Sequence, residues 1–194
     1  MKKSNCFLFP GQGSQSVGMC SEIFHNELSD VFFKESNNIL NYNIKEIILT
    51  NPSNLLNQTK YTQPSIFIVS AIIDQILKKN GIFPDLVSGH SLGEYSALVS
   101  SCALTFEDAL LIIKKRASKM NDIGRTEPGK MAAVFNHSIS EILDVLKQYN
   151  NKIVIANYNT ESQIIISGNK KCVDDLIKNA KKNNLRRIIP LDVS

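Results

Sequence analysis

The stretch Leu86-Val87-Ser88-Gly89-His90-Ser91-Leu92-Gly93 decides the fold. Its first three residues are predicted to form a short strand, and the apolar residues Ala97, Leu98 and Val99 place a helix after it. Gly-x-Ser-x-Gly between a strand and a helix is typical of a nucleophile elbow, in which a sharp turn exposes the serine hydroxyl. Glycines flank such a serine because the turn strains the backbone and larger neighbours would clash. The pattern therefore favours a nucleophilic Ser91 over a serine that only caps a helix.

A second glycine loop lies near the N-terminus. The apolar run Cys6-Phe7-Leu8-Phe9 is predicted to form a buried strand that enters the loop Pro10-Gly11-Gln12-Gly13-Ser14, and a helix is expected near Val17. An elbow serine needs donors for the developing oxyanion, and the backbone N–H of Leu92 supplies one. The N-terminal loop is the candidate for a second donor. The alternative is an ordinary strand-to-helix turn.

Three helical segments are expected from the spacing of apolar residues. They are short helices within residues 28–56, broken near Asn51-Pro52, a helix over residues 64–80, and a helix over residues 106–120. The second has Pro64 near its first turn and Gly81 just past its end. The third begins after Thr105, a residue type suited to an N-cap.

The pattern changes at Glu127-Pro128-Gly129-Lys130, where the helix signal stops and shorter, β-branched runs begin. The elements that follow read strand, helix, strand, strand, helix, strand, which is the order of a ferredoxin-like unit. The sequence therefore predicts an α/β protein with a larger portion in residues 1–128, an inserted ferredoxin-like subdomain in residues 129–192, and the start of the return in residues 193–194. The expected strands of the subdomain are residues 131–135, 153–157, 164–167 and 185–191, and its expected helices are residues 139–149 and a segment marked by Val173, Leu176, Ile177 and Ala180.

Composition excludes several classes of protein. The 194 residues suffice for one ordinary domain with a small insertion, and 43% of them are hydrophobic and 21% charged, as in a globular protein. The apolar runs are far shorter than the roughly 20 residues that cross a bilayer. The apolar stretch before Pro10 is also too short for a signal peptide. We therefore expect neither a membrane protein nor an exported one.

The charge balance argues against a nucleic-acid partner. Lys and Arg number 22 against 18 Asp and Glu, which leaves a net charge of only +4. The excess lies late in the chain and is interpreted as a solvated helix face or, alternatively, as a docking site for an acidic partner. The residues concerned are Lys170, Lys171, Lys178, Lys181, Lys182, Arg186 and Arg187.

The four cysteines point to a cytoplasmic protein. Cys6, Cys20, Cys102 and Cys172 form no Cys-x-x-Cys pair and have no histidine at metal-ligand spacing. They are expected to be reduced, mostly buried thiols, with neither a disulfide framework nor a metal site.

A base for Ser91 is hard to find among the three histidines. In elbow hydrolases the histidine follows the serine well downstream. His25 lies upstream, His90 adjoins the serine and should point elsewhere, and His137 lies near a helix start in the inserted unit. None of them fits, so we expect the catalytic histidine to be absent or the chain to stop before it.

Arg116 belongs to the basic run Lys114-Lys115-Arg116 on the helix after the elbow helix. By position alone, a solvated cationic face is the favoured interpretation. The functional alternative is a guanidinium that grips a substrate carboxylate through two hydrogen bonds, which lysine cannot reproduce.

Taken together, these motifs resemble the malonyl-CoA:acyl-carrier-protein transacylase family, the acyltransferases of fatty-acid and polyketide synthesis. The resemblance runs in colinear order from Cys6 to Ser194. The matching stretches are Phe9-Pro10-Gly11-Gln12-Gly13-Ser14-Gln15 with Gly18-Met19, Tyr61-Thr62-Gln63-Pro64-Ser65, Gly89-His90-Ser91-Leu92-Gly93-Glu94-Tyr95-Ser96-Ala97-Leu98, Gly129-Lys130-Met131-Ala132-Ala133-Val134, Ala156-Asn157-Tyr158-Asn159 and Ile166-Ser167-Gly168.

The resemblance implies a fold and a role for each matching residue. The fold is an α/β-hydrolase-like large subdomain with the ferredoxin-like insertion. Ser91 resembles the nucleophile that takes malonyl from coenzyme A, and the backbone N–H groups of Gln12 and Leu92 resemble the oxyanion hole. Arg116 resembles the partner of the free malonyl carboxylate, and Gln63 resembles a pocket-lining residue. The acyl group would then pass to the phosphopantetheine thiol of acyl carrier protein, with no cofactor, metal, membrane or nucleic acid involved, in an enzyme expected to be a monomer.

The sequence departs from the family pattern at its end. Leu191-Asp192-Val193-Ser194 resembles the strand that returns to the large subdomain, and in the family the catalytic histidine follows a few residues later. We therefore expect an incomplete large subdomain and an inactive or impaired fragment. Two alternatives stay open, a serine esterase or thioesterase and a non-catalytic remnant that binds a carrier protein.

Overall fold

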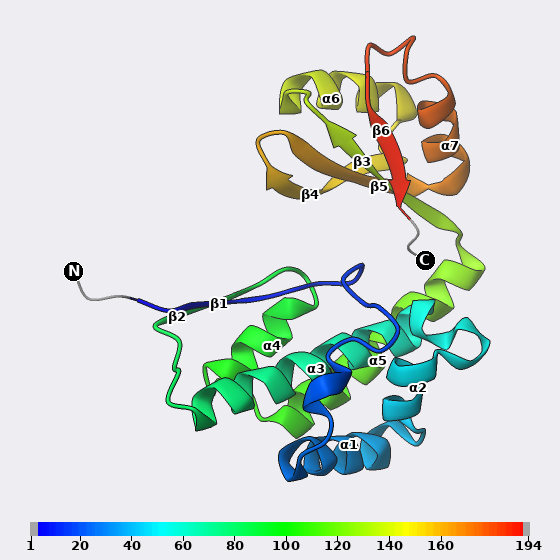
Figure 1. Ribbon diagram of the computed structural model, residues 1–194. Helices are drawn as coiled ribbons and strands as arrows, with labels where there is room; N and C mark the ends of the chain where they lie inside the picture. Colours follow the sequence, from blue (N-terminus) through cyan, green and yellow to red (C-terminus); the bar gives the residue numbers. More distant parts are fainter. Residues whose placement is uncertain (1–3, 192–194) are drawn as a thin grey trace. The chain divides into compact units, whose positions relative to one another are not determined.

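The computed structural model describes residues 4–191. The chain divides into two compact units, Met1–Asn121 and Asp122–Ser194 (Figure 1). The division falls inside helix α5, Phe106–Thr126, whereas the sequence places the boundary at Pro128, just past the end of that helix. The predicted return to the larger portion, residues 193–194, and the last residue of the predicted subdomain, residue 192, lie outside the described residues.

In the first unit, the two strands that precede the glycine loops pair in parallel. Strand β1, Cys6–Phe9, pairs in parallel with β2, Leu86–Gly89, so that Cys6 lies opposite Leu86 and Phe9 opposite Gly89. Helix α4, Gly93–Ser100, contacts both strands and packs against α3, Thr59–Lys79 (Figure 1). This pairing brings the ends of both strands together, and with them the two glycine loops.

Helix α3 forms the centre of the first unit. Its side chains from Thr62 to Ala71 are buried without interruption, and the helix packs against α1, Glu27–Leu40, and α2, Ile44–Thr50. Two 3₁₀ helices, Ser21–Ile23 and Pro52–Asn57, complete the unit. The core contains apolar residues of the helices and of the segments that precede α1 and α4, namely Phe24, Phe33, Leu40, Ile44, Ile48, Ile66, Phe67, Ile68, Val69, Ile72, Leu92, Ala109, Leu110 and Ile113.

The predicted helix of residues 64–80 is confirmed at its C-terminal end and wrong at its start. After α3, Gly81 has φ 77°, its N–H donates to Lys78, and the N–H of Ile82 donates to Leu77, which is a Schellman motif. The helix already begins at Thr59, so Pro64 lies inside it. A proline there removes one backbone donor. Burial of the surrounding face outweighs that loss.

The predicted helix near Val17 is also wrong. Gly18 and Cys20 have φ angles of 73° and 55°, in the left-handed region, and a right-handed helix cannot pass through two such residues. The N–H of Gly18 instead donates to the carbonyl of Ile48 at 2.8 Å. That bond ties the loop to the end of α2.

The second unit has the predicted ferredoxin-like fold. Its four strands form one antiparallel sheet in the order β4-β5-β3-β6. The elements are β3 (Gly129–Phe135), α6 (Ile139–Leu146), a 3₁₀ turn (Lys147–Tyr149), β4 (Ile153–Thr160), β5 (Gln163–Asn169), α7 (Lys170–Lys178) and β6 (Ile188–Leu191). Ile142 of α6 and Val173 of α7 belong to the same core as Ile166 of β5, so both helices cover the sheet.

The cysteines correct one expectation. All four have free thiols, but Cys6 and Cys102 are exposed and Cys20 and Cys172 are only half-buried. Cys6 begins the short strand β1, and Cys102 lies in a left-handed turn just after α4, with φ 60°. Both positions are at the surface of the unit, so the prediction of mostly buried thiols is wrong.

Candidate active site

Ser91 lies at the turn between β2 and α4, in the strained geometry that the sequence predicts. Its φ is 53°, in the left-handed region that non-glycine residues rarely adopt. A methyl group on Gly89 would lie 2.0 Å from the carbonyl carbon of Gly93, and one on Gly93 would lie 2.1 Å from the carbonyl oxygen of Phe9. Only glycine fits at both positions. The strand, the sharp turn and the helix of a nucleophile elbow are therefore present.

The side chain of Ser91 is exposed and meets Arg116. Nη2 of Arg116 donates to Oγ of Ser91 at 3.0 Å, and Nη1 donates to Oε1 of Gln63 at 2.6 Å. The guanidinium also lies over the ring of Tyr95, 5.9 Å from its centroid. Arg116 is half-buried, so the interpretation as a merely solvated cationic face is wrong.

Gln63 connects Arg116 to the N-terminal loop. Its side chain is fully buried, and Nε2 donates to Oε1 of Gln12 at 3.3 Å. Nε2 of Gln12 donates in turn to Oγ1 of Thr59 at 3.1 Å. Four of the five predicted site residues, Ser91, Arg116, Gln63 and Gln12, thus form one continuous hydrogen-bonded cluster within the first unit.

Leu92, the fifth predicted residue, anchors the elbow through its side chain. That side chain is 1% exposed and belongs to the core of the first unit. Because the backbone of Leu92 directly follows Ser91 at the start of α4, core packing of its side chain fixes the peptide N–H proposed as an oxyanion donor.

The N-terminal loop approaches the elbow closely. A methyl group on Gly11 would lie 2.6 Å from the carbonyl oxygen of His90, and the N–H of His90 donates to the carbonyl of Phe9 at 3.0 Å. Within the loop, Oγ of Ser14 donates to the carbonyl of Gly11 at 2.8 Å. Gln12 therefore sits beside the serine turn, as an oxyanion donor in this loop requires.

The histidines occupy other environments. His137 lies in the second unit, where its Nε2 accepts the backbone N–H of Arg186 at 3.0 Å and its Nδ1 lies 3.8 Å from Glu141. His25 is exposed in the segment between the first 3₁₀ helix and α1. His90 is exposed in the elbow turn itself.

Two residues of this cluster, Thr59 and Tyr95, are not predicted from the sequence. Tyr95 lies in the first turn of α4, four residues after Ser91, and its ring faces the guanidinium of Arg116. Thr59 precedes Gln63 by four residues and lies one turn earlier on α3. The expected helix start at Pro64 hid that relationship.

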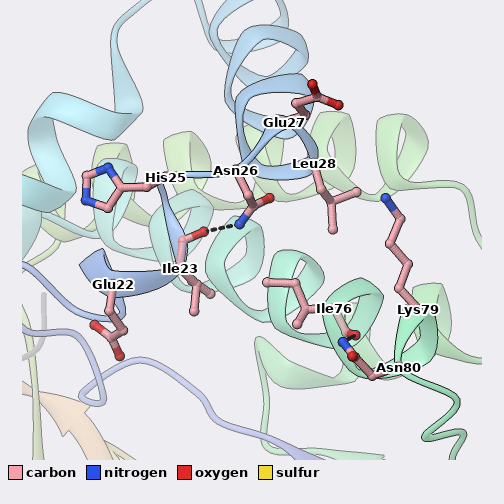
Figure 2. Close-up of a pocket in the computed structure, with 9 residues that line it drawn as sticks. All are labelled: Glu22, Ile23, His25, Asn26, Glu27, Leu28, Ile76, Lys79 and Asn80. Atoms are coloured by element: carbon pink, nitrogen blue, oxygen red, sulfur yellow. Dashed lines mark hydrogen bonds between the residues drawn. The ribbon is translucent and has the colours of Figure 1, made fainter.

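A hollow of about 720 Å³ lies elsewhere in the first unit, between the start of α1 and the end of α3. Figure 2 shows the charged side chains of Glu22, Glu27 and Lys79 spread around this hollow rather than aimed at one centre. The side-chain amide of Asn26 bonds to the backbone, donating to the carbonyl of Ile23 at 2.6 Å and accepting from the N–H of Ser29 at 3.0 Å. The arrangement there is that of a capped helix end.

Between residues 4 and 191, no three His, Cys, Asp or Glu side chains are grouped so that they could hold a metal ion. Over the same residues, no helix combines the length and the apolar character needed to span a bilayer.

The fold and the cluster place a strained serine, with an arginine hydrogen-bonded to its hydroxyl, at the strand-to-helix turn of a nucleophile-elbow protein. Comparison with known proteins identifies the family. The family model described as acyl transferase domain matches residues 6–193. The malonyl CoA-acyl carrier protein transacylase of Bacillus subtilis (strain 168) is 37% identical over 192 residues, which cover 97% of this chain and 61% of that protein. The chain therefore belongs to the acyl transferase domain family.

Solved structures agree with this assignment. MCAT from Streptococcus pneumoniae superposes with a TM-score of 0.88 at 38% identity, covering 98% of this chain and 63% of that one. A chain in the complex of a type II PKS acyl-carrier protein with its malonyl-transacylase matches with a TM-score of 0.89 at 28% identity, covering 97% of this chain and 62% of that one. The chain thus spans about 61% of the length of the Bacillus relative. Its α/β portion with a ferredoxin-like subdomain is the fold of these acyltransferases.

Proposed function

We propose that this chain carries the nucleophile half of a malonyl transfer from malonyl-CoA to the phosphopantetheine thiol of acyl carrier protein, in fatty-acid biosynthesis. One observation carries the proposal. The hydroxyl of an elbow serine, Ser91, lies 3.0 Å from the guanidinium of Arg116, which is the group best suited to a carboxylate on the acyl chain. Relatives that bear the name malonyl CoA-acyl carrier protein transacylase support it.

The proposed reaction proceeds in two transfers through Ser91. In the first, Oγ attacks the thioester carbonyl as its proton passes to a base, and the backbone N–H groups of Gln12 and Leu92 hold the oxyanion of the tetrahedral intermediate. The carbon–sulfur bond then breaks, and coenzyme A leaves as the protonated thiol. In the second, the phosphopantetheine thiol loses its proton and attacks the ester. The malonyl thioester forms, and Oγ recovers a proton. None of His25, His90 and His137 is assigned as the base.

Arg116 selects the acyl group in this proposal. The guanidinium has five N–H donors and no acceptor, so it can grip a malonyl carboxylate with two parallel hydrogen bonds. In the structure, Nη2 of Arg116 donates to Ser91 and Nη1 donates to Gln63. A carboxylate that takes the donor facing Ser91 frees the serine oxygen at the same time. Acetyl has no carboxylate and gains neither effect.

The partners follow from this chemistry. Malonyl-CoA and acyl carrier protein are the proposed substrates, and the phosphopantetheine belongs to the carrier, so we assign no cofactor to this chain. The free thiols of all four cysteines support a reducing compartment, and we place the protein in the cytoplasm as a monomer.

The test is loading of radiolabelled malonyl-CoA onto protein expressed from its complete coding sequence. Ser91→Ala should abolish covalent label, whereas Ser101→Ala, a change at an exposed serine just beyond α4, should leave it unchanged. Label that persists in Ser91→Ala would overturn the assignment of the nucleophile.

The competing function is a serine esterase or thioesterase, which uses the same elbow but passes the acyl group to water. Arg116→Ala separates the two, with Lys119→Ala on the same helix as the control. Loss of the preference for malonyl-CoA over acetyl-CoA in Arg116→Ala alone supports transfer. Release of free malonate without transfer to acyl carrier protein, and indifference to Arg116→Ala, would support the hydrolase.

A further inference from the structure

The carboxamide of Gln12 is held at both ends by one face of α3. Its Nε2 donates to Oγ1 of Thr59 at 3.1 Å, and its Oε1 accepts from Nε2 of Gln63 at 3.3 Å. Thr59 and Gln63 are one helical turn apart, and both side chains are fully buried. Two hydrogen bonds therefore hold the Gln12 side chain against α3, the helix at the centre of the unit.

The chemistry of arginine sets the direction of every bond in this chain of groups. Arg116 can only donate, so Gln63 must present its oxygen to Nη1. The amide nitrogen of Gln63 then faces Gln12 and must meet an oxygen there. This leaves the nitrogen of Gln12 to donate to the hydroxyl oxygen of Thr59.

The loop needs these two hydrogen bonds because its glycines allow its backbone many conformations. Gln12 lies between two glycines, and Gly13 has φ 106°. The other side-chain bonds of the loop are local, from Ser14 to Gly11 and from Gly13 to Gln15. The bonds of Gln12 to Thr59 and Gln63 instead connect the loop to a helix about fifty residues away in sequence, and so they fix it relative to α3.

We propose that Thr59 is a positioning residue for acyl transfer. Its hydroxyl fixes the side chain of Gln12, and through it the backbone N–H that stabilises the oxyanion beside Ser91. This role rests on the proposed function, which assigns that N–H to the oxyanion. Thr59 itself touches no reacting atom. Its effect belongs to the transition state, because the oxyanion forms only there.

Three variants on α3 test the proposal. Thr59→Val keeps the shape of the side chain and removes the acceptor, and Thr59→Ser keeps the acceptor. Thr62→Val is the matched control, since Thr62 is equally buried and its hydroxyl donates to Leu56 at 2.6 Å. Thermal midpoints of all three are recorded, so that each comparison is made at a temperature where every variant is folded.

The first readout is the backbone amide of Gln12 in the 194-residue chain, followed by ¹⁵N relaxation. We expect its order parameter to fall from about 0.85, typical of rigid backbone, toward about 0.6 in Thr59→Val. Thr59→Ser and Thr62→Val should retain the rigid value. An unchanged value in Thr59→Val, or an equal fall in Thr62→Val, would overturn the proposal.

The second readout is malonyl loading by protein expressed from its complete coding sequence. Thr59→Val should lower the loading rate constant about tenfold with KM for malonyl-CoA within twofold, less than the hundredfold or more for loss of an oxyanion donor itself. Thr59→Ser should restore the rate. A rise in KM alone, or no rescue by serine, would overturn the proposal. If unaltered protein loads no malonyl at Ser91, the proposed function fails, while the Gln12 amide still decides whether Thr59 positions the loop.

Discussion

Gly93→Ala tests the closeness of the elbow to the N-terminal strand. The added methyl would lie 2.1 Å from the carbonyl oxygen of Phe9, 2.7 Å from its carbonyl carbon and 2.8 Å from the carbonyl oxygen of Pro10. These are backbone atoms, so no side-chain rotation relieves the clash. Ordinary contact needs about 3.5 Å, and β1 would have to move away by more than about 1 Å.

Such a movement breaks other interactions of the same pair of strands. The N–H of His90 donates to the carbonyl of Phe9 at 3.0 Å, and β1 is held to β2 along its whole length. Overpacking usually costs about 1–3 kcal/mol, and the lost hydrogen bond places this variant at the upper end, about 3 kcal/mol of unfolding free energy.

Urea unfolding of the 194-residue chain provides the assay, followed separately at amides of α3 in the first unit and α7 in the second. Gly129→Ala is the control, because a methyl group there meets only the carbonyl of Gly168 at 3.5 Å. Gly93→Ala should destabilise the first unit and leave the second unchanged. A change in the first unit below about 0.5 kcal/mol would refute the reasoning.

Three further changes probe other parts of the chain. Burial raises the pKa of Glu35, and so does a hydrogen bond that its protonated carboxyl donates to Glu107. The stability that Glu35 contributes is therefore complete below its unfolded pKa and is lost as pH rises through its folded pKa, so Glu35→Gln should raise the thermal midpoint at pH 7 and give no gain near pH 4 in scanning calorimetry. Lys78→Met leaves the carboxylate of Asp74, which is 3% exposed, without its 2.7 Å ion-pair partner, and should cost about 3 kcal/mol in the urea transition of the first unit. Ser138→Ala removes the capping box of α6 and should cost about 1 kcal/mol in the second unit alone.

Local signals predicted the elements that depend on local chemistry. The elbow was predictable because Gly89 is required by a contact within the motif itself, against the backbone of Gly93. The ferredoxin-like unit was predictable because each of its elements is short and amphipathic, so the order alone defines the fold. The N-cap at Thr105 is likewise confirmed, since its Oγ1 accepts the N–H of Asp108 at 3.1 Å.

Tertiary contacts decided what the sequence could not. The sequence predicts a helix near Val17, but the N–H of Gly18 donates to the carbonyl of Ile48, a partner that only the folded chain supplies. The start of α3 was misplaced because proline favours a helix start, whereas burial of the residues around Pro64 sustains a helix through it. The cysteines were expected inside because free thiols usually are buried, a tendency that says nothing of a strand end or a turn.

The position of Arg116 shows how one tertiary contact changes the meaning of a residue. On α5, Arg116 lies at the border between a buried face with Ile113 and Ala117 and an exposed face with Lys115 and Lys119. Its helix position alone would therefore allow its side chain to point into solvent. Gln63 of α3 turns it inward by accepting Nη1 at 2.6 Å, and the second nitrogen then reaches Ser91. A lysine at this position has one nitrogen on a flexible stem and could not fix both neighbours in this planar arrangement. The guanidinium that faces Ser91 therefore requires an arginine at this position and fixes the direction of the Gln63 amide. Through that amide it also fixes Gln12 of the N-terminal loop.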